Sequence, residues 1–287
     1  MPQSSRRLGG SAIDSEPQAR SRRRPSSWYC YGVWSGSGNA KLGSVEARRE
    51  ITKLRELSVI LPTYNEAANL PALAAALDAA LAGIDWEAVV VDDDSPDGTA
   101  EAVAALGIAN PRWRCLRRVG RRGLASACIE GMAMADGEYL AVMDADLQHD
   151  ERLLPAMLAK AKAESLDLVI GSRYIAGGSV AAFTRVRRFL SLSGVRLTLA
   201  LLKDIAVSDP LSGFFLLRRA RFAEIAPRLS GRGYKILLDI LASVDRPLAI
   251  GELAYQFRAR RAGKSKLDAR VIFEFLALLI EKRRRRV

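Results

Sequence analysis

Short apolar runs alternate with stretches of helical periodicity along the chain from residue 57 onward. LSVIL at 57–61 and EAVVVD at 87–92 predict buried strands, whereas Leu70, Leu73 and Leu77 recur at the spacing of one helix face. The pattern continues with predicted strands at 113–119, 139–143 and 167–171, and with predicted helices at 124–135 and 153–161. Strands that alternate with helices predict an α/β fold, with a mostly parallel, Rossmann-like sheet and helices on both faces.

The rhythm of the pattern changes after Gly178, and composition divides the chain into three parts. The remaining predicted elements are a helix at 186–202, a strand at 212–217, a helix at 236–244, a half-buried strand around 253–257 and a helix at 267–282. Residues 1–56 are rich in Ser, Arg and Gly without sustained periodicity, and they are predicted to be a disordered basic tail. We expect one α/β domain over 57–270 and a C-terminal helix with a basic tail over 271–287.

Polar or turn-forming residues follow the carboxyl ends of several predicted strands. Pro62 is expected to end the first strand, Asp92 ends the second, Asp144 follows the strand at 139–143, and Arg173 follows a later one. In open α/β sheets, ligands bind outside the carboxyl ends of the parallel strands. The sequence therefore predicts a binding site along that edge of the sheet.

The segment after the strand at 139–143 is the strongest candidate for a metal site. Asp144, Asp146 and Gln148 fall at alternate positions, so in an extended segment their side chains would point the same way. Two carboxylates and an amide oxygen suit a hard divalent cation such as Mg²⁺ or Mn²⁺. The alternative interpretation is a strand-to-helix loop in which Asp150 caps the helix.

Two loops at the predicted edge could hold a nucleoside. PTYNE at 62–66 offers an aromatic ring, an amide and a carboxylate, although it could equally be a turn in which Asn65 caps the next helix. DDDSPDGT at 92–99 places three consecutive carboxylates after the second strand. Here Asp93 could accept hydrogen bonds from a base or a ribose, and the alternative is a solvated turn.

Three basic sites could bind phosphate. Arg173 follows a strand, Arg187 and Ser191 lie four residues apart on one helix face, and Arg260 precedes Lys266 within FRARRAGKSKL. A guanidinium group binds phosphate through two parallel hydrogen bonds, and a lysine adds a point charge. Each residue alone could also be an ordinary solvated surface charge.

The formal net charge of +12 indicates an anionic partner: nucleic acid, an anionic membrane surface or a phosphorylated substrate. Basic residues gather near the ends, at 20–24 and 282–286, and this suits tethering to a membrane surface. A nucleic-acid-binding protein would instead interleave basic residues with aromatic ones on a groove-fitting element, so nucleic acid is the less favoured partner.

The composition also bears on chemistry and location. His149 is the only histidine, which nearly excludes Ser-His-Asp catalysis and His-based zinc sites. The three cysteines lack metal-site spacing, and a reduced, cytoplasmic compartment is the simpler interpretation. No segment reaches the roughly 18 to 20 apolar residues that a membrane span requires. We therefore expect a peripheral protein at the cytoplasmic face of a membrane.

Seven motifs in a fixed order resemble those of family 2 glycosyltransferases, specifically the polyprenol-phosphate (dolichol-phosphate) mannosyltransferases. They are PTYNE, VVVDDDSPDGT, MDADLQH, GSRY, DPLSGFF, GYKILLDIL and FRARRAGKSKL, and together they span about residues 57–269. The resemblance implies a metal-dependent GT-A fold enzyme. It would transfer mannose from GDP-mannose to a polyprenyl phosphate with inversion, giving a β-linked polyprenyl phosphate mannose.

The resemblance also implies roles for individual residues. The nucleoside and donor would be held by Pro62, Tyr64, Glu66, Val91, Asp93, Asp144, Ala145, Asp146, Arg173, Arg260 and Lys266. The metal would be held by Asp146 and Gln148. The catalytic set would be Asp144, Asp146, Arg187 and Ser191, of which the last two would receive the lipid phosphate.

Some features depart from the pattern of the resembled family. GLASA at 123–127 stands where a second glycine is common, and the spacing after Ser191 is shifted by one residue, so Arg188 could replace Arg187. Many relatives continue into membrane helices, and a separate membrane-anchoring subunit is therefore a further expected partner. The motifs do not fix the donor, so UDP-glucose or another nucleotide sugar stays an alternative to GDP-mannose.

Overall fold

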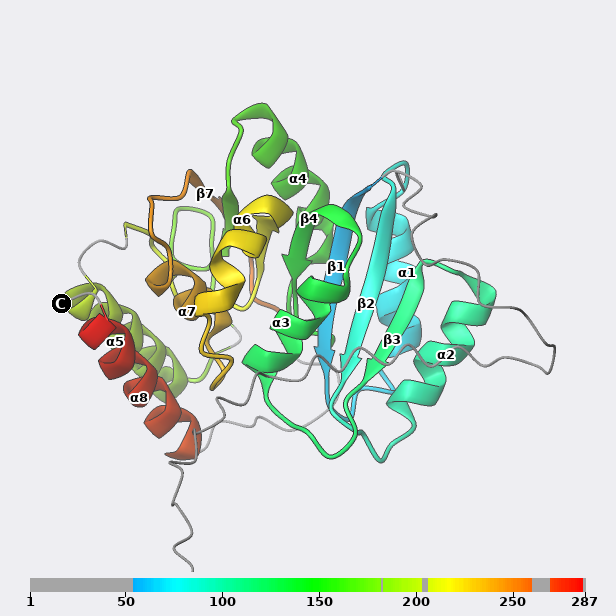
Figure 1. The fold of residues 1–287 in the computed structure, drawn as a ribbon, viewed down its shortest axis with the longest axis horizontal. Helices are drawn as coiled ribbons and strands as arrows, with labels where there is room; N and C mark the ends of the chain where they lie inside the picture. Colours follow the sequence, from blue (N-terminus) through cyan, green and yellow to red (C-terminus); the bar gives the residue numbers. More distant parts are fainter. Residues whose placement is uncertain (1–53, 182, 203–205, 260–268, 286–287) are drawn as a thin grey trace, which may run out of the picture. The chain divides into compact units, whose positions relative to one another are not determined.

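The computed structural model describes residues 54–181, 183–202, 206–259 and 269–285, and these residues build a seven-stranded sheet (Figure 1). The strands are β1 (Arg55–Thr63), β2 (Trp86–Asp92), β3 (Trp113–Arg117), β4 (Gly137–Val142), β5 (Leu168–Ser172), β6 (Phe215–Arg218) and β7 (Ile250–Ala254). Their order across the sheet is β3-β2-β1-β4-β6-β5-β7. Strand β6 runs antiparallel to β4 and β5, and the other strands run parallel to one another.

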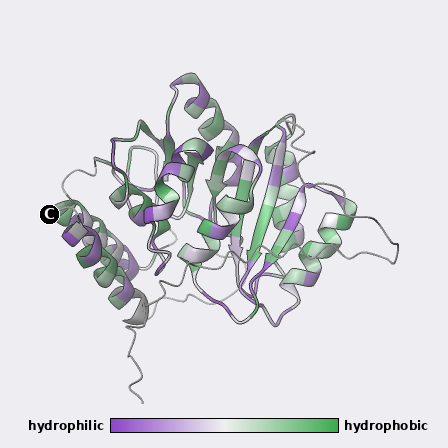
Figure 2. Ribbon diagram, viewed as in Figure 1, coloured by the Kyte–Doolittle hydropathy of each residue, from purple (hydrophilic) through white to green (hydrophobic). Residues whose placement is uncertain are grey.

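Helices cover both faces of the sheet, as Figure 1 shows. They are α1 (Leu70–Ala80), α2 (Thr99–Ala109), α3 (Leu124–Met134), α4 (Leu154–Ala163), α5 (Arg185–Leu201), α6 (Arg219–Ile225), α7 (Ile236–Ala242) and α8 (Ala269–Arg285). One apolar cluster joins the sheet to α1, α2 and α4, and a second joins its other face to α3, α5, α6, α7 and α8. Strands buried on both faces explain the continuous apolar runs in the sequence, and Figure 2 shows the central strands as largely hydrophobic.

Neighbouring residues of one strand serve opposite cores. Val59 and Leu61 of β1 pack in the cluster with α1 and α4, whereas Ile60 packs in the cluster with α3. The alternation follows from the pleat of a strand, whose successive side chains point to opposite faces. The mostly parallel α/β sheet predicted from the sequence is thereby confirmed.

Two details differ from the sequence-based expectation. Strand β1 does not end at Pro62 but continues to Thr63, because Pro62 still pairs with Val91 of β2 at the end of the ladder. The C-terminal basic run is also not wholly exposed, since Lys282 is buried with a relative exposure of 1%. Its charge is therefore unavailable to a membrane surface.

Candidate active site at the carboxyl edge of the sheet

The predicted edge exists, because the parallel strands end at the same level. Thr63 at the end of β1 pairs with Asp92 at the end of β2, which pairs in turn with Arg117 of β3. On the other side of β1, the backbone N–H of Met143 after β4 donates to the carbonyl of Ile60. The loops that carry the candidate residues therefore leave the sheet side by side.

Hydrogen bonds tie the PTYNE loop to the DDDSPDGT loop. The backbone N–H of Asn65 donates to Ser95 Oγ at 2.9 Å, and that of Glu66 donates to Thr99 Oγ1 at 3.0 Å. Asn65 has a left-handed backbone (φ 61°) and does not cap a helix; the residue at the N-cap position of α1 is Asn69. The proposed cap is therefore wrong, and Asn65 serves as a turn residue instead.

Asp93 is a fixed, buried carboxylate, in contrast to the alternative of a solvated turn. Its Oδ1 accepts from Arg118 Nε at 2.7 Å and its Oδ2 from the N–H of Gly123 at 2.7 Å. Arg118 is itself buried, at 2% exposure, and also donates to Ser126 and Glu130. Arg118 could not be identified from the sequence, because no sequence feature distinguishes it from the other arginines of its loop.

The aromatic ring of the PTYNE loop faces a second basic residue. The guanidinium carbon of Arg122 lies 4.1 Å from the centroid of the Tyr64 ring. This cation–π contact places the guanidinium group of Arg122 over one face of the ring. Nearby, the neighbouring carboxylate Asp92 is fully buried and accepts from the N–H and the hydroxyl of Ser95, so it serves the turn.

The segment that holds Asp144, Asp146 and Gln148 is a turn and not the extended chain that the alternation argument assumed. Leu147 adopts a left-handed conformation (φ 61°), and Asp146 Oδ1 accepts from the N–H of Gln148 at 3.1 Å. Asp146 and Gln148 are buried, whereas the Asp144 side chain is 40% exposed. Asp150 caps the short 3-10 helix Glu151–Leu153, as the alternative interpretation predicted.

The only histidine supports this turn. The N–H of Asp144 donates to His149 Nδ1 at 3.0 Å, and the imidazole stacks on Phe214 with ring centroids 5.2 Å apart. Burial, together with the positive charge of Arg173, lowers the pKa of His149 to about 4, although the nearby carboxylates of Asp146 and Asp209 act in the opposite direction. His149 is therefore neutral at physiological pH, with its accepting nitrogen turned to the backbone.

The oxygen atoms of this turn fit a divalent cation that is bound partly by the protein and partly by phosphate. Gln148 Nε2 donates to the carbonyl of Arg258 at 3.0 Å, which directs the amide oxygen away from that carbonyl. Among the described residues, no group of three or more His, Cys, Asp or Glu side chains could enclose a metal. One carboxylate and one amide oxygen instead match Mg²⁺ or Mn²⁺, which commonly complete their shells with water and substrate phosphate.

Arg173 lies at the edge as predicted, but it has a partner that the sequence did not reveal. Its Nε and Nη2 donate to Asp209 Oδ2 and Oδ1, each at 2.8 Å, and Asp209 is fully buried. Burial disfavours the charge of Arg173, but Asp209 outweighs it and raises the pKa of the guanidinium. Asp209 therefore holds one side of the guanidinium group in a fixed orientation.

Lys235, immediately before α7, is a site residue that sequence reasoning missed. Burial, together with the charges of Arg173 and Arg187, lowers its pKa to about 8. The carboxylates of Asp209 and Asp144 act in the opposite direction. The lysine thus lies within electrostatic reach of both the Asp144 turn and the Arg173 pair, although its motif, GYKILLDIL, offered only a lone cation before an apolar helix.

The candidate acceptor residues lie on the first turns of α5. Ser191 and Tyr174 are joined by a hydrogen bond of 2.7 Å between their hydroxyl oxygens. The guanidinium carbon of Arg187 lies 4.2 Å from the ring centroid of Phe183. Its neighbour Arg188 lines a cavity that Arg173 and Tyr174 also line.

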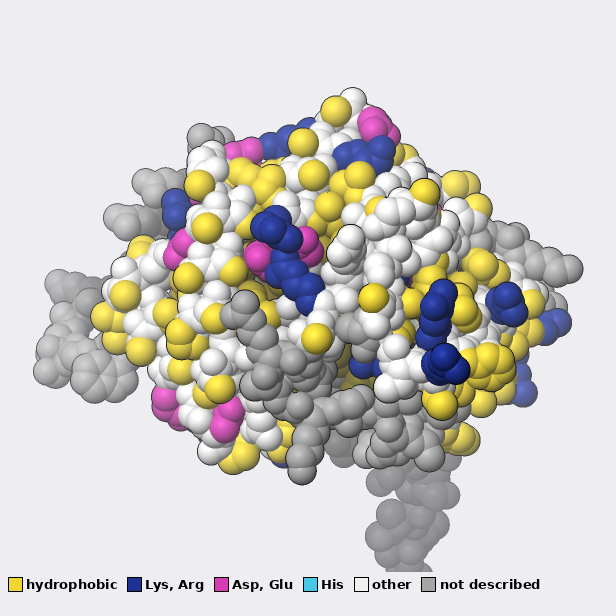
Figure 3. Space-filling view, turned by 180° about the vertical axis from the view of Figure 1, so that it is seen from behind, with side chains coloured by type: hydrophobic (Ala, Val, Ile, Leu, Met, Phe, Trp, Pro, Cys, Tyr) yellow, Lys and Arg dark blue, Asp and Glu magenta, His cyan; other side chains and the backbone are white. Residues whose placement is uncertain are grey.

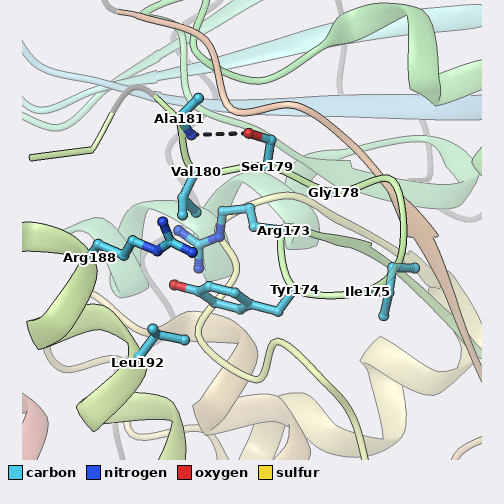
Figure 4. Close-up of a pocket in the computed structure, with 9 residues that line it drawn as sticks. All are labelled: Arg173, Tyr174, Ile175, Gly178, Ser179, Val180, Ala181, Arg188 and Leu192. Carbon is cyan, nitrogen blue, oxygen red and sulfur yellow. Dashed lines mark hydrogen bonds between the residues drawn. The ribbon is translucent and has the colours of Figure 1, made fainter. Parts of the chain in front are cut away.

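That cavity has a volume of about 370 Å³ and lies between α5 and the loop after β5. Figure 4 shows the side chains of Arg173 and Arg188 directed into it, with the ring of Tyr174 beside them. Val180 and Leu192 add apolar surface to its wall. A cavity with two cations and apolar walls suits an anion that carries an apolar chain.

Three of the remaining predicted residues are buried or half-buried, and two lie outside the described part of the chain. Val91 is buried near the end of β2, Ala145 is buried in the turn after β4, and Pro62 is half-buried in β1. Arg260 and Lys266 lie outside the described residues.

Comparisons with known proteins agree with this geometry. Residues 58–226 match the family described as Glycosyl transferase family 2. The chain is 41% identical over 224 residues to a dolichol-phosphate mannosyltransferase of Pyrococcus furiosus, covering 77% of this chain and 62% of that protein. It is 33% identical over 277 residues to the dolichol-phosphate mannosyltransferase of Mycosarcoma maydis, covering 94% and 87%.

A likeness to solved structures supports the fold. Glucosyl-3-phosphoglycerate synthase from Mycobacterium tuberculosis, crystallised with Mn²⁺, UDP-glucose and phosphoglyceric acid, superposes with a TM-score of 0.60. The two are 22% identical, and the match covers 80% of each chain. Together with the sheet, this likeness confirms the predicted GT-A fold.

Proposed function

Because the chain belongs to glycosyl transferase family 2, we propose that it transfers mannose from GDP-mannose to a polyprenyl phosphate, giving a β-linked polyprenyl phosphate mannose. The names of the relatives support the mannosyl group and the lipid phosphate. The observation that carries the proposal is the carboxyl edge of the sheet, where the Asp144 turn follows β4 and Arg173, held by Asp209, follows β5.

The donor is bound by residues of four neighbouring loops. Tyr64 offers a ring face to the base, and Asp93, oriented by Arg118, accepts hydrogen bonds from the nucleoside. Arg173 presents to the diphosphate the side of its guanidinium group that Asp209 does not hold, and Lys235 adds a point charge. The donor-binding roles that the resemblance implies are also proposed for six further residues: Pro62, Glu66, Val91, Ala145, Arg260 and Lys266.

Asp146 and Gln148 are the residues that hold the divalent cation, either Mg²⁺ or Mn²⁺. A protein of the same fold was crystallised with Mn²⁺, which supports the use of a divalent metal. When bound beside the diphosphate, such a cation neutralises negative charge on the departing group.

The acceptor needs no general base, because its phosphate is already ionised at neutral pH. A phosphate oxygen forms a bond to the anomeric carbon while the bond from that carbon to the diphosphate oxygen breaks, and GDP leaves with the electron pair. Attack in line with the leaving group inverts the anomeric configuration. Lys235 and Arg173 stabilise the charge that develops on GDP, which is the harder part of the reaction.

The absence of a base agrees with the state of His149. Its imidazole is buried and neutral, and its Nδ1 already accepts a hydrogen bond from the backbone of Asp144. This ring therefore supports the turn, and we assign it no proton transfer.

Arg187 is proposed to bind the acceptor phosphate together with Ser191. Replacing Arg187 by Ala is expected to raise KM for the lipid phosphate about 10- to 100-fold, because a hydrogen bond to a charged group contributes about 1.5–3 kcal/mol. Initial rates at varied lipid and saturating donor give this constant. Arg188→Ala is measured in parallel, since Arg188 lines the neighbouring cavity.

Arg218→Ala serves as the matched control, because Arg218 is an accessible arginine where β6 pairs with the first half of β4, away from the carboxyl edge. A larger effect of Arg188→Ala than of Arg187→Ala would transfer the acceptor role to Arg188. Unchanged lipid KM in both variants would place the acceptor elsewhere.

The lipid acceptor must be met at a membrane, and helices α5 and α8 offer a surface for it. They pack against each other and expose Val186, Phe189 and Leu190 from α5 and Phe273, Leu276 and Ile280 from α8. Figure 3 shows apolar and basic side chains intermingled on the side of the molecule where α5 lies. No described helix is long and apolar enough to cross a bilayer.

We expect this surface to bind vesicles that contain anionic lipid. Phe189→Ser combined with Phe273→Ser should reduce flotation with such vesicles at least about fivefold. Burial of each phenylalanine side chain in the membrane contributes up to about 1.5–3 kcal/mol of binding free energy, and the serine variants lose this contribution. High salt should weaken binding of the wild type, since each basic residue near an anionic surface contributes about 1 kcal/mol.

Ile108→Ser on α2 is the control, because Ile108 is 89% exposed but lies away from α5 and α8. Flotation of the double variant equal to that of the wild type would rule out this surface. Failure of the wild type to float would favour a separate membrane-anchoring subunit as the partner at the cytoplasmic face.

The donor is tested by sugar transfer to a polyprenyl phosphate from a panel of nucleotide sugars. GDP-mannose is expected to be used at least about 100-fold more efficiently than UDP-glucose, because a base or hydroxyl that leaves a buried polar partner unpaired is strongly rejected. Preference for UDP-glucose would make the protein a related polyprenyl-phosphate glycosyltransferase. Binding of DNA or RNA at physiological salt, without any transfer, would overturn the enzyme assignment.

A further inference from the structure

The C-terminal helix is fastened to the body of the protein by a buried ion pair. Lys282 of α8 places its Nζ 2.5 Å from Asp239 Oδ1, and the two residues are 1% and 0% exposed. The same ammonium group donates to Ser243 Oγ at 2.6 Å and to the carbonyl of Arg228 at 3.3 Å. Three partners therefore satisfy the three donors of the ammonium group.

The other end of this pair organises the segment that leads into α7. Asp239 Oδ2 accepts from the N–H of Ser230 at 2.8 Å and from its hydroxyl at 2.7 Å. The N–H of Asp239 donates to the carbonyl of Lys235 at 3.0 Å, and this hydrogen bond forms the first turn of α7. The carboxylate of Asp239 thus joins α8 to the loop before α7, while the main chain of the same residue holds the carbonyl of Lys235.

Lys282 is the one cation, among the described residues, that forms an ion pair with Asp239. A buried carboxylate that loses its partner keeps the cost of desolvation, and it must then become protonated or draw in water. Either response would disturb the first turn of α7, where the main chain of Lys235 is held.

We propose that Lys282 is a positioning residue, which fixes Asp239 and thereby directs the ammonium group of Lys235 toward the donor diphosphate. The inference rests on the proposed function, because it takes Lys235 as a ligand of that diphosphate. The position of α8 against the body of the protein would then determine the geometry of the donor site. A shift of α8, the helix proposed to face the membrane, would change the position of Lys235.

The test compares Lys282→Met with Arg284→Met, which removes an exposed charge from the same helix. Affinity for GDP in the presence of Mn²⁺ is measured by calorimetry, and donor KM and kcat are measured with detergent-solubilised acceptor. Lys282→Met is expected to weaken GDP binding and to raise donor KM about tenfold, with little change in lipid KM. Arg284→Met should match the wild type.

Double variants separate positioning from a merely structural role. If Lys282 acts through Lys235, then Lys282→Met should change GDP affinity less than twofold in a Lys235→Met background. An undiminished, tenfold effect in that background would overturn the inference, as would wild-type donor KM in the folded Lys282→Met variant.

A variant without the unpaired carboxylate covers the case in which Lys282→Met does not fold. Lys282→Met with Asp239→Leu removes both charges, and it is expected to fold while still showing the weakened GDP affinity. Wild-type affinity in this variant would overturn the inference and leave the proposed function intact. Failure of the wild type to bind GDP or GDP-mannose would overturn both.

Discussion

Asp146→Asn is expected to lower mannose transfer about 100- to 1,000-fold and to remove its dependence on Mn²⁺. The loss of one group that stabilises developing charge typically has an effect of this size. Asn keeps the oxygen that accepts from the N–H of Gln148, so the turn is retained while the negative charge that attracts the cation is lost. The measurements are kcat over a titration of Mn²⁺ and the affinity for Mn²⁺ followed by its paramagnetic resonance signal.

Asp136→Asn is the matched control, because Asp136 is an exposed carboxylate before β4 that pairs with Arg114. It should leave both the rate and the Mn²⁺ titration unchanged. Full activity of Asp146→Asn in excess EDTA would remove the metal from the mechanism.

Lys235→Met is expected to lower kcat/KM for the donor about 100-fold, because it removes a charge that stabilises the diphosphate in a partly buried site. Burial and the neighbouring arginines lower the pKa of Lys235 to about 8 in the free enzyme. The lysine is therefore mostly charged at pH 7 and loses its proton as pH rises through about 8. The kcat/KM of the wild type should fall along that alkaline limb.

Lys235→Arg supplies the control for this pH dependence, because arginine stays protonated over the whole range. Any difference between its kcat/KM and that of the wild type at pH 7 then reflects geometry, and the fall above pH 8 should be absent. An alkaline limb that persists unchanged in Lys235→Arg would assign the titration to another group.

The sheet was predictable from the sequence because its strands are buried on both faces. Runs such as Leu57–Leu61 are uniformly apolar, and the helical spacing of Leu70, Leu73 and Leu77 supplied the alternation. The direction of β6 was not predictable, because Phe215, Leu216 and Leu217 are apolar on both faces and carry no information about direction.

The position of the candidate site was also predictable, since strand ends are visible in the sequence, but its partnerships were not. Asp93 pairs with Arg118, Arg173 with Asp209, and each pair joins loops that only the fold brings together. A single charged residue in an apolar motif gives no sign of its partner. The same reason explains why Lys235 and Lys282 were missed.

The shape of the Asp144–Gln148 turn shows a different limit. The alternation of polar side chains suggested extended backbone, but Leu147 adopts a left-handed conformation that a leucine rarely takes. No residue type in this segment signals such a turn. The predicted residues are therefore at the edge of the sheet, while the reason given for their common orientation was wrong.

The most direct test of the central claim is the product formed from GDP-mannose and a polyprenyl phosphate with Mn²⁺. The account predicts a mannosyl phosphate lipid whose anomeric configuration is β by nuclear magnetic resonance, and whose formation stops when EDTA removes the metal. An α-linked product, or no transfer to the lipid phosphate under these conditions, would contradict it.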